Sequence, residues 1–107
     1  MAGWHRVAFS LQLPAESVAE YARRHAQIWA ELRTAIAAQG GHNFTIFAVP
    51  AIGRVFGYLE VEDLDRWAAG AGTELTARWW RYMAEIMPAH EDGSPIGDEI
   101  IEVFHQD

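Results

Sequence analysis

The segment that decides the fold is residues 42–61, which read HNFTIFAVPAIGRVFGYLEV. Two runs rich in β-branched and aromatic residues, 42–49 and 54–61, flank a short PAIG connection. Such residues favour strands, whereas Pro and Gly at the two ends of a short connection favour a tight turn. The segment therefore predicts an antiparallel β-hairpin in the middle of the chain.

A strand and a helix are expected before this hairpin. Residues 4–13 alternate between apolar side chains and small or polar ones, which predicts a half-buried strand. Pro14 ends that strand and can open a helix. The helix is predicted to run over residues 15–39, because the glycine pair at 40–41 supplies a C-terminal stop.

A second helix and a last strand are expected after the hairpin. Residues 62–69 predict a short helix or turn, and residues 74–87 predict a longer helix with Thr73 as its N-cap. Residues 96–105 predict the last strand. The order β-α-β-β-α-β is the split βαβ arrangement, so the fold class is α+β, a ferredoxin-like sandwich with both helices on one face of the sheet.

The opposite face of that sheet also carries apolar side chains that must be buried. The helical face cannot bury all the large side chains of the hairpin, such as Phe44, Ile46, Phe56 and Tyr58. A second copy of the chain is the simplest cover, so we expect a homodimer. The chain has 107 residues and no repeat or linker, so we expect residues 1–107 to form a single domain.

The composition of the chain excludes several classes of binding partner. The formal net charge is −7, which disfavours nucleic acids and anionic membranes and leaves a neutral ligand as the best match. There is no cysteine, no signal-like start and no apolar run long enough to span a bilayer, so we expect a cytoplasmic protein. The five histidines show no metal-binding spacing and no glycine-rich phosphate loop follows a strand, so we expect neither metal nor cofactor.

His25 is the first candidate for chemistry. On a helix, residues four apart share a face, so His25 lies beside Tyr21 in a stripe that is otherwise apolar. Intermediate burial is common for histidine, and one interpretation is a core side chain whose nitrogens are bonded to the backbone or to hydroxyls. The other is an acid–base group, because imidazole titrates near neutrality and no carboxylate on that face gives it a structural partner.

The pair Trp79-Trp80 is the second candidate. Adjacent helical residues point about 100° apart, so one indole can face the core while the other is less covered. The pair is equally compatible with a core-and-flank arrangement and with a wall that stacks on a sugar. His42 and Asn43 follow the glycine pair and are either turn residues or partners that support a site.

Taken together, the segments resemble the L-rhamnose mutarotase family. The resemblance is carried by EYARRHAQIWAEL (20–32), GGHNFTIF (40–47), RWWRYMAEIMP (78–88) and DGSPI with EVF (92–104). It covers nearly the whole chain in order, and the combination YxRRHxxIWxEL with WWxYMxxxMP is specific. The family implies a dimeric α+β barrel built from ferredoxin-like subunits.

The resemblance also implies roles for particular residues. The family's proton-donating histidine falls on His25 and its sugar-binding tyrosine on Tyr21. Its tryptophan pair falls on Trp79 and Trp80. A further family tyrosine falls on Phe44, where the hydroxyl is missing and the sugar preference is therefore open. His42 and Asn43 are expected only as supporting partners.

The implied activity is an isomerase that interconverts the α and β anomers of L-rhamnose, or of a related 6-deoxy sugar, without a cofactor. Two other functions stay open. One is a cofactor-free monooxygenase of similar architecture that acts on a hydrophobic substrate, since fold alone does not choose a reaction. The other is a sugar-binding module that catalyses nothing.

Overall fold

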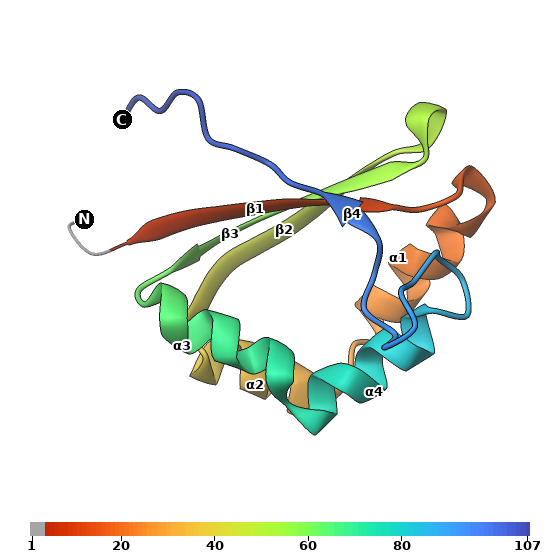
Figure 1. The fold of residues 1–107 in the computed structure, drawn as a ribbon, viewed down its shortest axis with the longest axis horizontal. Coiled ribbons are helices and arrows are strands. Elements are labelled where there is room, and N and C mark those ends of the chain that lie inside the picture. The colour runs from red at the N-terminus through yellow and green to blue at the C-terminus, as the bar shows by residue number, and fades with distance from the viewer. Residues whose placement is uncertain (1–3) are drawn as a thin grey trace.

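The computed structural model describes residues 4–107 as an antiparallel sheet with all of its helices on one face (Figure 1). The strands are β1 (His5–Gln12), β2 (Gly41–Val49), β3 (Arg54–Val61) and β4 (Gly97–Asp98), in the order β2-β3-β1-β4. The helices are α1 (Val18–Ala26), α2 (Ala30–Ala38), α3 (Leu64–Ala69) and α4 (Glu74–Met83). This order and pairing confirm the ferredoxin-like α+β prediction.

The central hairpin is confirmed. β2 and β3 pair antiparallel, and the connection at Pro50–Ile52 forms one 3-10 turn. It closes at Gly53, whose φ of 64° lies in the left-handed region that glycine adopts without strain. The register shifts between His42 and Thr45, where β2 carries one extra residue relative to β3. This bulge lets the strand bend at the end nearest α3.

The prediction of one helix over residues 15–39 is wrong, because the helix breaks in its middle. α1 ends at Ala26 and α2 begins at Ala30, with Trp29 in an extended conformation between them. The indole of Trp29 packs against Trp79 at a centroid distance of 5.1 Å and against Tyr82 at 5.6 Å. Tertiary packing of this ring therefore accompanies a break that helix propensity does not reveal.

The predicted helix over residues 74–87 is shorter than expected. α4 begins after Thr73, whose hydroxyl accepts the N–H of Thr76 and confirms the predicted N-cap. Regular helix ends at Met83, and turns lead on to Pro88.

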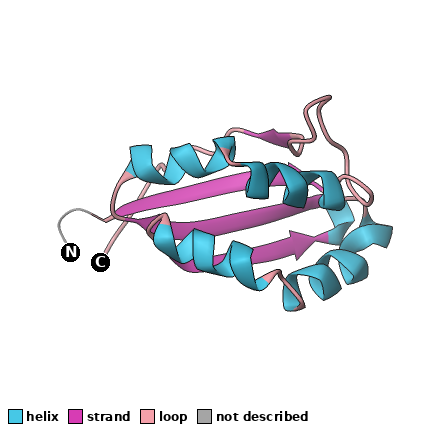
Figure 2. Cartoon of the chain, turned by 90° about the horizontal axis from the view of Figure 1, so that it is seen from below, coloured by secondary structure: helices cyan, strands magenta, loops and turns pink. Residues whose placement is uncertain are grey.

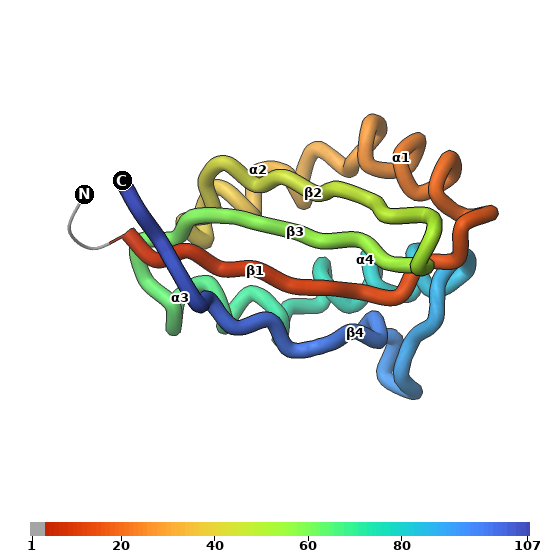
Figure 3. The backbone as a smooth tube through the Cα atoms, turned by 90° about the horizontal axis from the view of Figure 1, so that it is seen from above, coloured from red at the N-terminus to blue at the C-terminus, as the bar shows by residue number. Residues whose placement is uncertain are grey.

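The predicted last strand over residues 96–105 is also largely wrong. Only Gly97 and Asp98 pair with β1. A Cβ at Gly97 would collide with the carbonyl oxygen of Ser10, so the close approach is limited to a glycine. Beyond Asp98 the chain leaves the edge and crosses the sheet face opposite the helices, where Arg6 and Glu102 form a bidentate pair at 2.9 Å (Figures 1 and 3).

The core lies between the sheet and the helices, which cover the sheet as Figure 2 shows from below. The side chains of Leu13, Leu32 and Val55 are among those buried there. The outer face of the sheet is different, because Phe47 of β2 is 66% exposed, and Phe104 of the C-terminal segment that crosses this face is 76% exposed. No helix within residues 4–107 combines the length and apolar character needed to cross a bilayer.

Candidate active site

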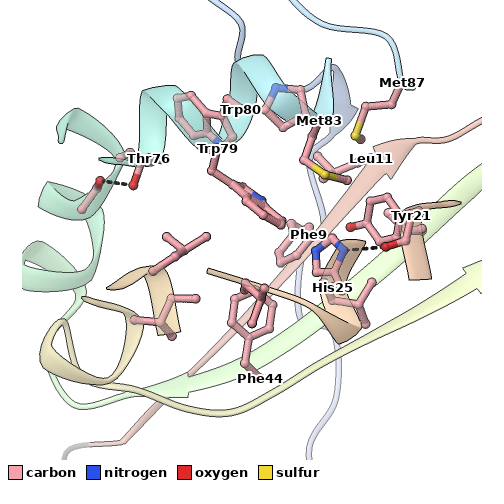
Figure 4. A pocket seen from close by; sticks show the side chains of 18 of the residues that line it. Phe9, Leu11, Tyr21, His25, Phe44, Thr76, Trp79, Trp80, Met83 and Met87 are labelled. Carbon is pink, nitrogen blue, oxygen red and sulfur yellow. Dashed lines mark hydrogen bonds between the residues drawn. The ribbon is translucent and has the colours of Figure 1, made fainter. Parts of the chain in front are cut away.

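A cavity of about 720 Å³ lies between the helices and the sheet. Its walls come from α1, α2 and α4 on one side and from β1 and β2 on the other, so sequence-distant segments meet around it (Figure 4). Five of the predicted site residues line it: Tyr21, His25, Phe44, Trp79 and Trp80. The fold therefore brings these candidates into one space.

His25 reaches the cavity from the last turn of α1. Its ring stacks on that of Tyr21 with centroids 4.3 Å apart and planes inclined by 27°. Its Nδ1 atom lies 2.9 Å from the carbonyl oxygen of Tyr21. A carbonyl oxygen only accepts hydrogen bonds, so Nδ1 carries the proton and donates. In the neutral ring, Nε2 is then the nitrogen with a free lone pair.

Burial sets the protonation of both groups. It lowers the pKa of His25 below its usual 6.5, against a smaller opposite effect of the hydrogen bond to the Tyr21 backbone. It also raises the pKa of the Tyr21 phenol to about 12. At neutral pH the site therefore holds a neutral imidazole beside a protonated phenol. The Tyr21 hydroxyl makes no hydrogen bond to any residue between 4 and 107 and remains available to a ligand.

Trp79 serves both as core and as cavity wall. It is only 8% exposed, and its ring meets His25 edge-on at a centroid distance of 5.4 Å. Trp80, the next residue on α4, is half-buried and lines the same cavity. Trp79 is therefore a core residue that also lines the cavity, and its stacking on a sugar stays a prediction.

Arg24 ties α1 to α4 directly behind the site. It donates to the backbone carbonyl of Tyr82 at 2.7 Å and to the carboxylate of Glu85 at 3.1 Å. Its guanidinium also lies over the Tyr82 ring, 4.1 Å from the centroid. Hydrogen bonds from Arg23 and Arg24 lower the pKa of Glu20 to about 2. Because His25 adjoins Arg24 and Trp79 lies one helical turn from Tyr82, this network fixes their relative position.

Phe44 contributes a second aromatic group at the sheet side of the cavity. Its ring is edge-on to Phe9 at 6.0 Å and to Trp67 at 6.2 Å. A Cβ at Gly57 would collide with the Phe9 ring, so the glycine allows that ring to lie flat on the sheet and leaves the cavity open.

Several lining residues were not identified from the sequence as part of a site. They are Phe9, Gln39, Trp67, Thr76, Met83 and Met87. Strand alternation could have placed Phe9 on the helical face of β1. The others depend on how α2, α3 and α4 pack over the sheet, for which the sequence gives no local signal.

His42 and Asn43 lie outside the cavity lining. The amide of Asn43 donates to Glu60 at 2.7 Å, and the His42 ring is edge-on to Trp4 at 4.6 Å. Both residues are exposed, at the bulge of β2. Within residues 4–107, no three His, Asp or Glu side chains gather in a way that would hold a metal ion.

Comparisons with known proteins agree with one another. A family model described as L-rhamnose mutarotase matches residues 6–106. A relative of that name from Opitutus terrae is 47% identical over 102 residues, which cover 95% of this chain and 98% of the relative. Another from Tolumonas auensis is 43% identical over 100 residues, covering 94% and 96%. The crystal structure of an L-rhamnose mutarotase from Formosa agariphila superposes with a TM-score of 0.86 at 29% identity, over 96% of this chain and 99% of that one.

Proposed function

The chain belongs to the L-rhamnose mutarotase family, and on this premise we propose that it interconverts the α and β anomers of L-rhamnose with His25 as the acid–base group. The named relatives are enzymes that isomerise a sugar at its anomeric centre. The observation that supports the assignment to His25 is its hydrogen bond to the Tyr21 carbonyl, which commits Nδ1 and leaves Nε2 free beside a cavity large enough for a sugar.

The reaction opens and closes the pyranose ring. Nε2 of neutral His25 takes the proton of the anomeric hydroxyl, and the electron pair left on that oxygen forms the aldehyde C=O bond. The bond from the anomeric carbon to the ring oxygen breaks at the same time, and its electron pair takes a proton from the Tyr21 hydroxyl, which recovers that proton when the ring closes. After rotation of the aldehyde the steps run in reverse, and His25 acts as the proton donor to the anomeric oxygen. Acid–base assistance of this kind contributes roughly 10²–10⁴-fold.

Tyr21 is the group that meets the ring oxygen. Its phenol stays protonated across the neutral range, since burial raises its pKa to about 12. A protonated hydroxyl can donate to the ring oxygen while charge develops there, so Tyr21 both orients the sugar and assists opening.

The aromatic walls bind the sugar itself. Trp79 and Trp80 offer flat apolar faces to the C–H groups of the ring and to the methyl group of a 6-deoxy sugar. Phe44 adds an apolar contact opposite them and brings no hydroxyl.

Exchange NMR on equilibrated L-rhamnose tests this function. The wild-type protein should accelerate transfer of magnetisation between the two anomeric signals, and His25→Ala should lose most of that acceleration. His105→Ala, which changes an exposed histidine of the C-terminal segment, is the matched control and should behave as wild type. Binding of the sugar with exchange left at its spontaneous rate would indicate a sugar-binding module. Absence of both would favour a hydrophobic substrate.

We further propose that two copies pair through the outer face of the sheet, as a dimeric α+β barrel requires. That face carries exposed apolar side chains, including Phe47 and Phe56, and the C-terminal segment adds Phe104. Sedimentation equilibrium should give a dimer for the wild type and a monomer for Phe47→Lys. A wild-type monomer at micromolar concentration would refute the pairing.

We also propose a cytoplasmic location. A chain without cysteine has no disulfide to form and suits a reducing compartment. Subcellular fractionation would detect the protein with cytoplasmic markers, and its recovery with secreted proteins would refute the proposal.

A further inference from the structure

The cavity is larger than a single monosaccharide needs. At the roughly 30 Å³ that each molecule occupies in liquid water, its volume of about 720 Å³ holds about two dozen waters. L-Rhamnose has eleven non-hydrogen atoms, so one molecule leaves about half of the space unfilled.

The spare space lies at one end. His25, Tyr21 and Met83 mark the end where the anomeric chemistry takes place, and Thr76 marks the other (Figure 4). Thr76 and Met83 lie on the same helix α4, and seven residues at about 1.5 Å each separate them by about 10 Å along its axis. The cavity therefore follows α4 for more than one sugar ring.

The far end offers an amide without a protein partner. The side chain of Gln39 lies against Gly70, where a Cβ would collide with it. It makes no hydrogen bond to any residue between 4 and 107, and in that part of the chain no buried side-chain nitrogen or oxygen lacks a partner. The donors and acceptor of the Gln39 amide are consequently open to the cavity or to solvent.

The same end carries aromatic and hydroxyl groups. Trp67 of α3 and Phe44 of β2 line it with ring centroids 6.2 Å apart, and the Thr76 hydroxyl donates to the Gly70 carbonyl at 2.8 Å. Indole and phenyl rings contact the C–H faces of a sugar, and a free amide bonds to its hydroxyls. An acyl or alkyl group would use the rings and leave the amide unpaired, so this set of side chains favours a second sugar over a purely apolar substituent.

We propose that this end, formed by Gln39, Trp67, Gly70, Ala71 and Thr76, is a second sugar subsite, and that the enzyme accepts L-rhamnose at the reducing end of a disaccharide. This inference rests on the proposed function, because it requires the anomeric carbon of rhamnose to lie at His25. The hydroxyl at C4 is directly across the ring from that carbon, so the proposal places it toward the far end. The second sugar is therefore linked through O4, and the free anomeric hydroxyl still undergoes ring opening.

Parallel exchange NMR on L-rhamnose, 4-O-methyl-L-rhamnose and 4-O-glucosyl-L-rhamnose tests the subsite. We expect the wild type to accelerate all three, with the lowest half-saturating concentration for the disaccharide. Ala71→Trp fills the far end and should lower the preference for disaccharide over L-rhamnose at least tenfold. Gly72→Trp adds the same bulk one residue later, where a Cβ meets no atom within 4 Å, and should leave the preference unchanged.

Gln39→Met supplies a second variant of similar size that removes only the amide. Loss of its hydrogen bonds should weaken disaccharide binding about 3- to 10-fold. Equal half-saturating concentrations for the methyl ether and the disaccharide would overturn the subsite. So would a wild type that does not accelerate anomer exchange of the disaccharide, or an Ala71→Trp variant that keeps the wild-type preference for disaccharide over L-rhamnose. Failure with L-rhamnose as well would instead overturn the proposed function.

Discussion

The Nδ1 atom of His25 donates to the carbonyl oxygen of Tyr21, four residues earlier on the same helix, across 2.9 Å. Both residues lie within α1, so this carbonyl is also the i−4 acceptor of the His25 backbone N–H and takes the imidazole bond on its second lone pair. The backbone of α1 thus selects the tautomer of the imidazole and leaves Nε2 without a hydrogen bond to residues 4–107.

The activity should fall on the acid side of neutrality. Only neutral His25 can take a proton, and burial lowers its pKa below 6.5. The exchange rate is expected to be flat from pH 7 upward and to fall below the shifted pKa. A pH profile of kcat/KM by exchange NMR checks this, and a midpoint above 6.5 would contradict it.

Stability should respond to the same group. Between the folded pKa and 6.5, the unfolded chain binds more protons at His25 than the folded chain does, so the free energy of unfolding rises with pH across that window. Urea unfolding at several pH values should show this slope in the wild type. His25→Gln should reduce it, and an unchanged slope would assign it to other groups.

Tyr21→Phe should separate chemistry from packing. The ring stays, so its stack on His25 and most of its buried contacts are retained. Loss of the hydroxyl removes a donor to the ring oxygen, and we expect kcat to fall about 10- to 100-fold with little change in Tm. An unchanged kcat with a raised KM would make Tyr21 a binding group only.

Replacing Trp79 and replacing Trp80 should lower the free energy of unfolding by different amounts. Trp79 is 8% exposed and packs on Trp29, so Trp79→Ala should lower the free energy of unfolding by about 3–5 kcal/mol. Trp80 is half-buried, so Trp80→Ala should cost clearly less while raising KM for the sugar. Urea titrations measure the free energy of unfolding, and exchange kinetics measure KM. Equal losses of stability for the two variants would contradict the assignment of Trp79 to the core and of Trp80 to a less buried position.

Arg24→Gln should weaken the packing of α1 against α4 around the site, although Arg24 itself does not line the cavity. The side chain joins α1 to Tyr82 of α4 and to Glu85 in the turn that follows, so its loss should lower Tm by several degrees and raise KM. Arg81→Gln is the matched control, because the ion pair of Arg81 with Glu74 at 3.1 Å stays within α4. A larger fall in Tm for the control would refute the role of Arg24 as the tie.

Phe44→Tyr should change the preference among sugars. The ring lines the cavity and is 37% exposed, so a hydroxyl can be added with little cost to the fold. We expect KM to fall for sugars that offer a hydroxyl to it. Parallel assays with L-rhamnose, other 6-deoxy sugars and pentoses would show this, whereas an even change across all of them would exclude a polar contact.

The structural elements that depend on a few adjacent residues could be predicted from the sequence. The hairpin is confirmed because its turn depends on Pro50 and on a positive φ at Gly53, both local properties. The N-cap at Thr73 is another local property. The helix break at Trp29 and the early end of β4 were missed, because they accompany packing against Trp79 and close approach to Ser10, residues far away in the sequence.

By itself, the sequence determined the fold class and the face of α1 that carries Tyr21 and His25, because periodicity, turn chemistry and residue spacing act over a few residues. The resemblance of its motifs to known mutarotases indicated the family. Only the tertiary structure decided what surrounds that face. The lowered pKa of His25, the wall formed by Trp79 and the unfilled far end near Gln39 all arise where α2, α3 and α4 close over the sheet. The physical reason is that burial and contact join residues distant in the chain, and spacing along the chain does not encode the space left between them.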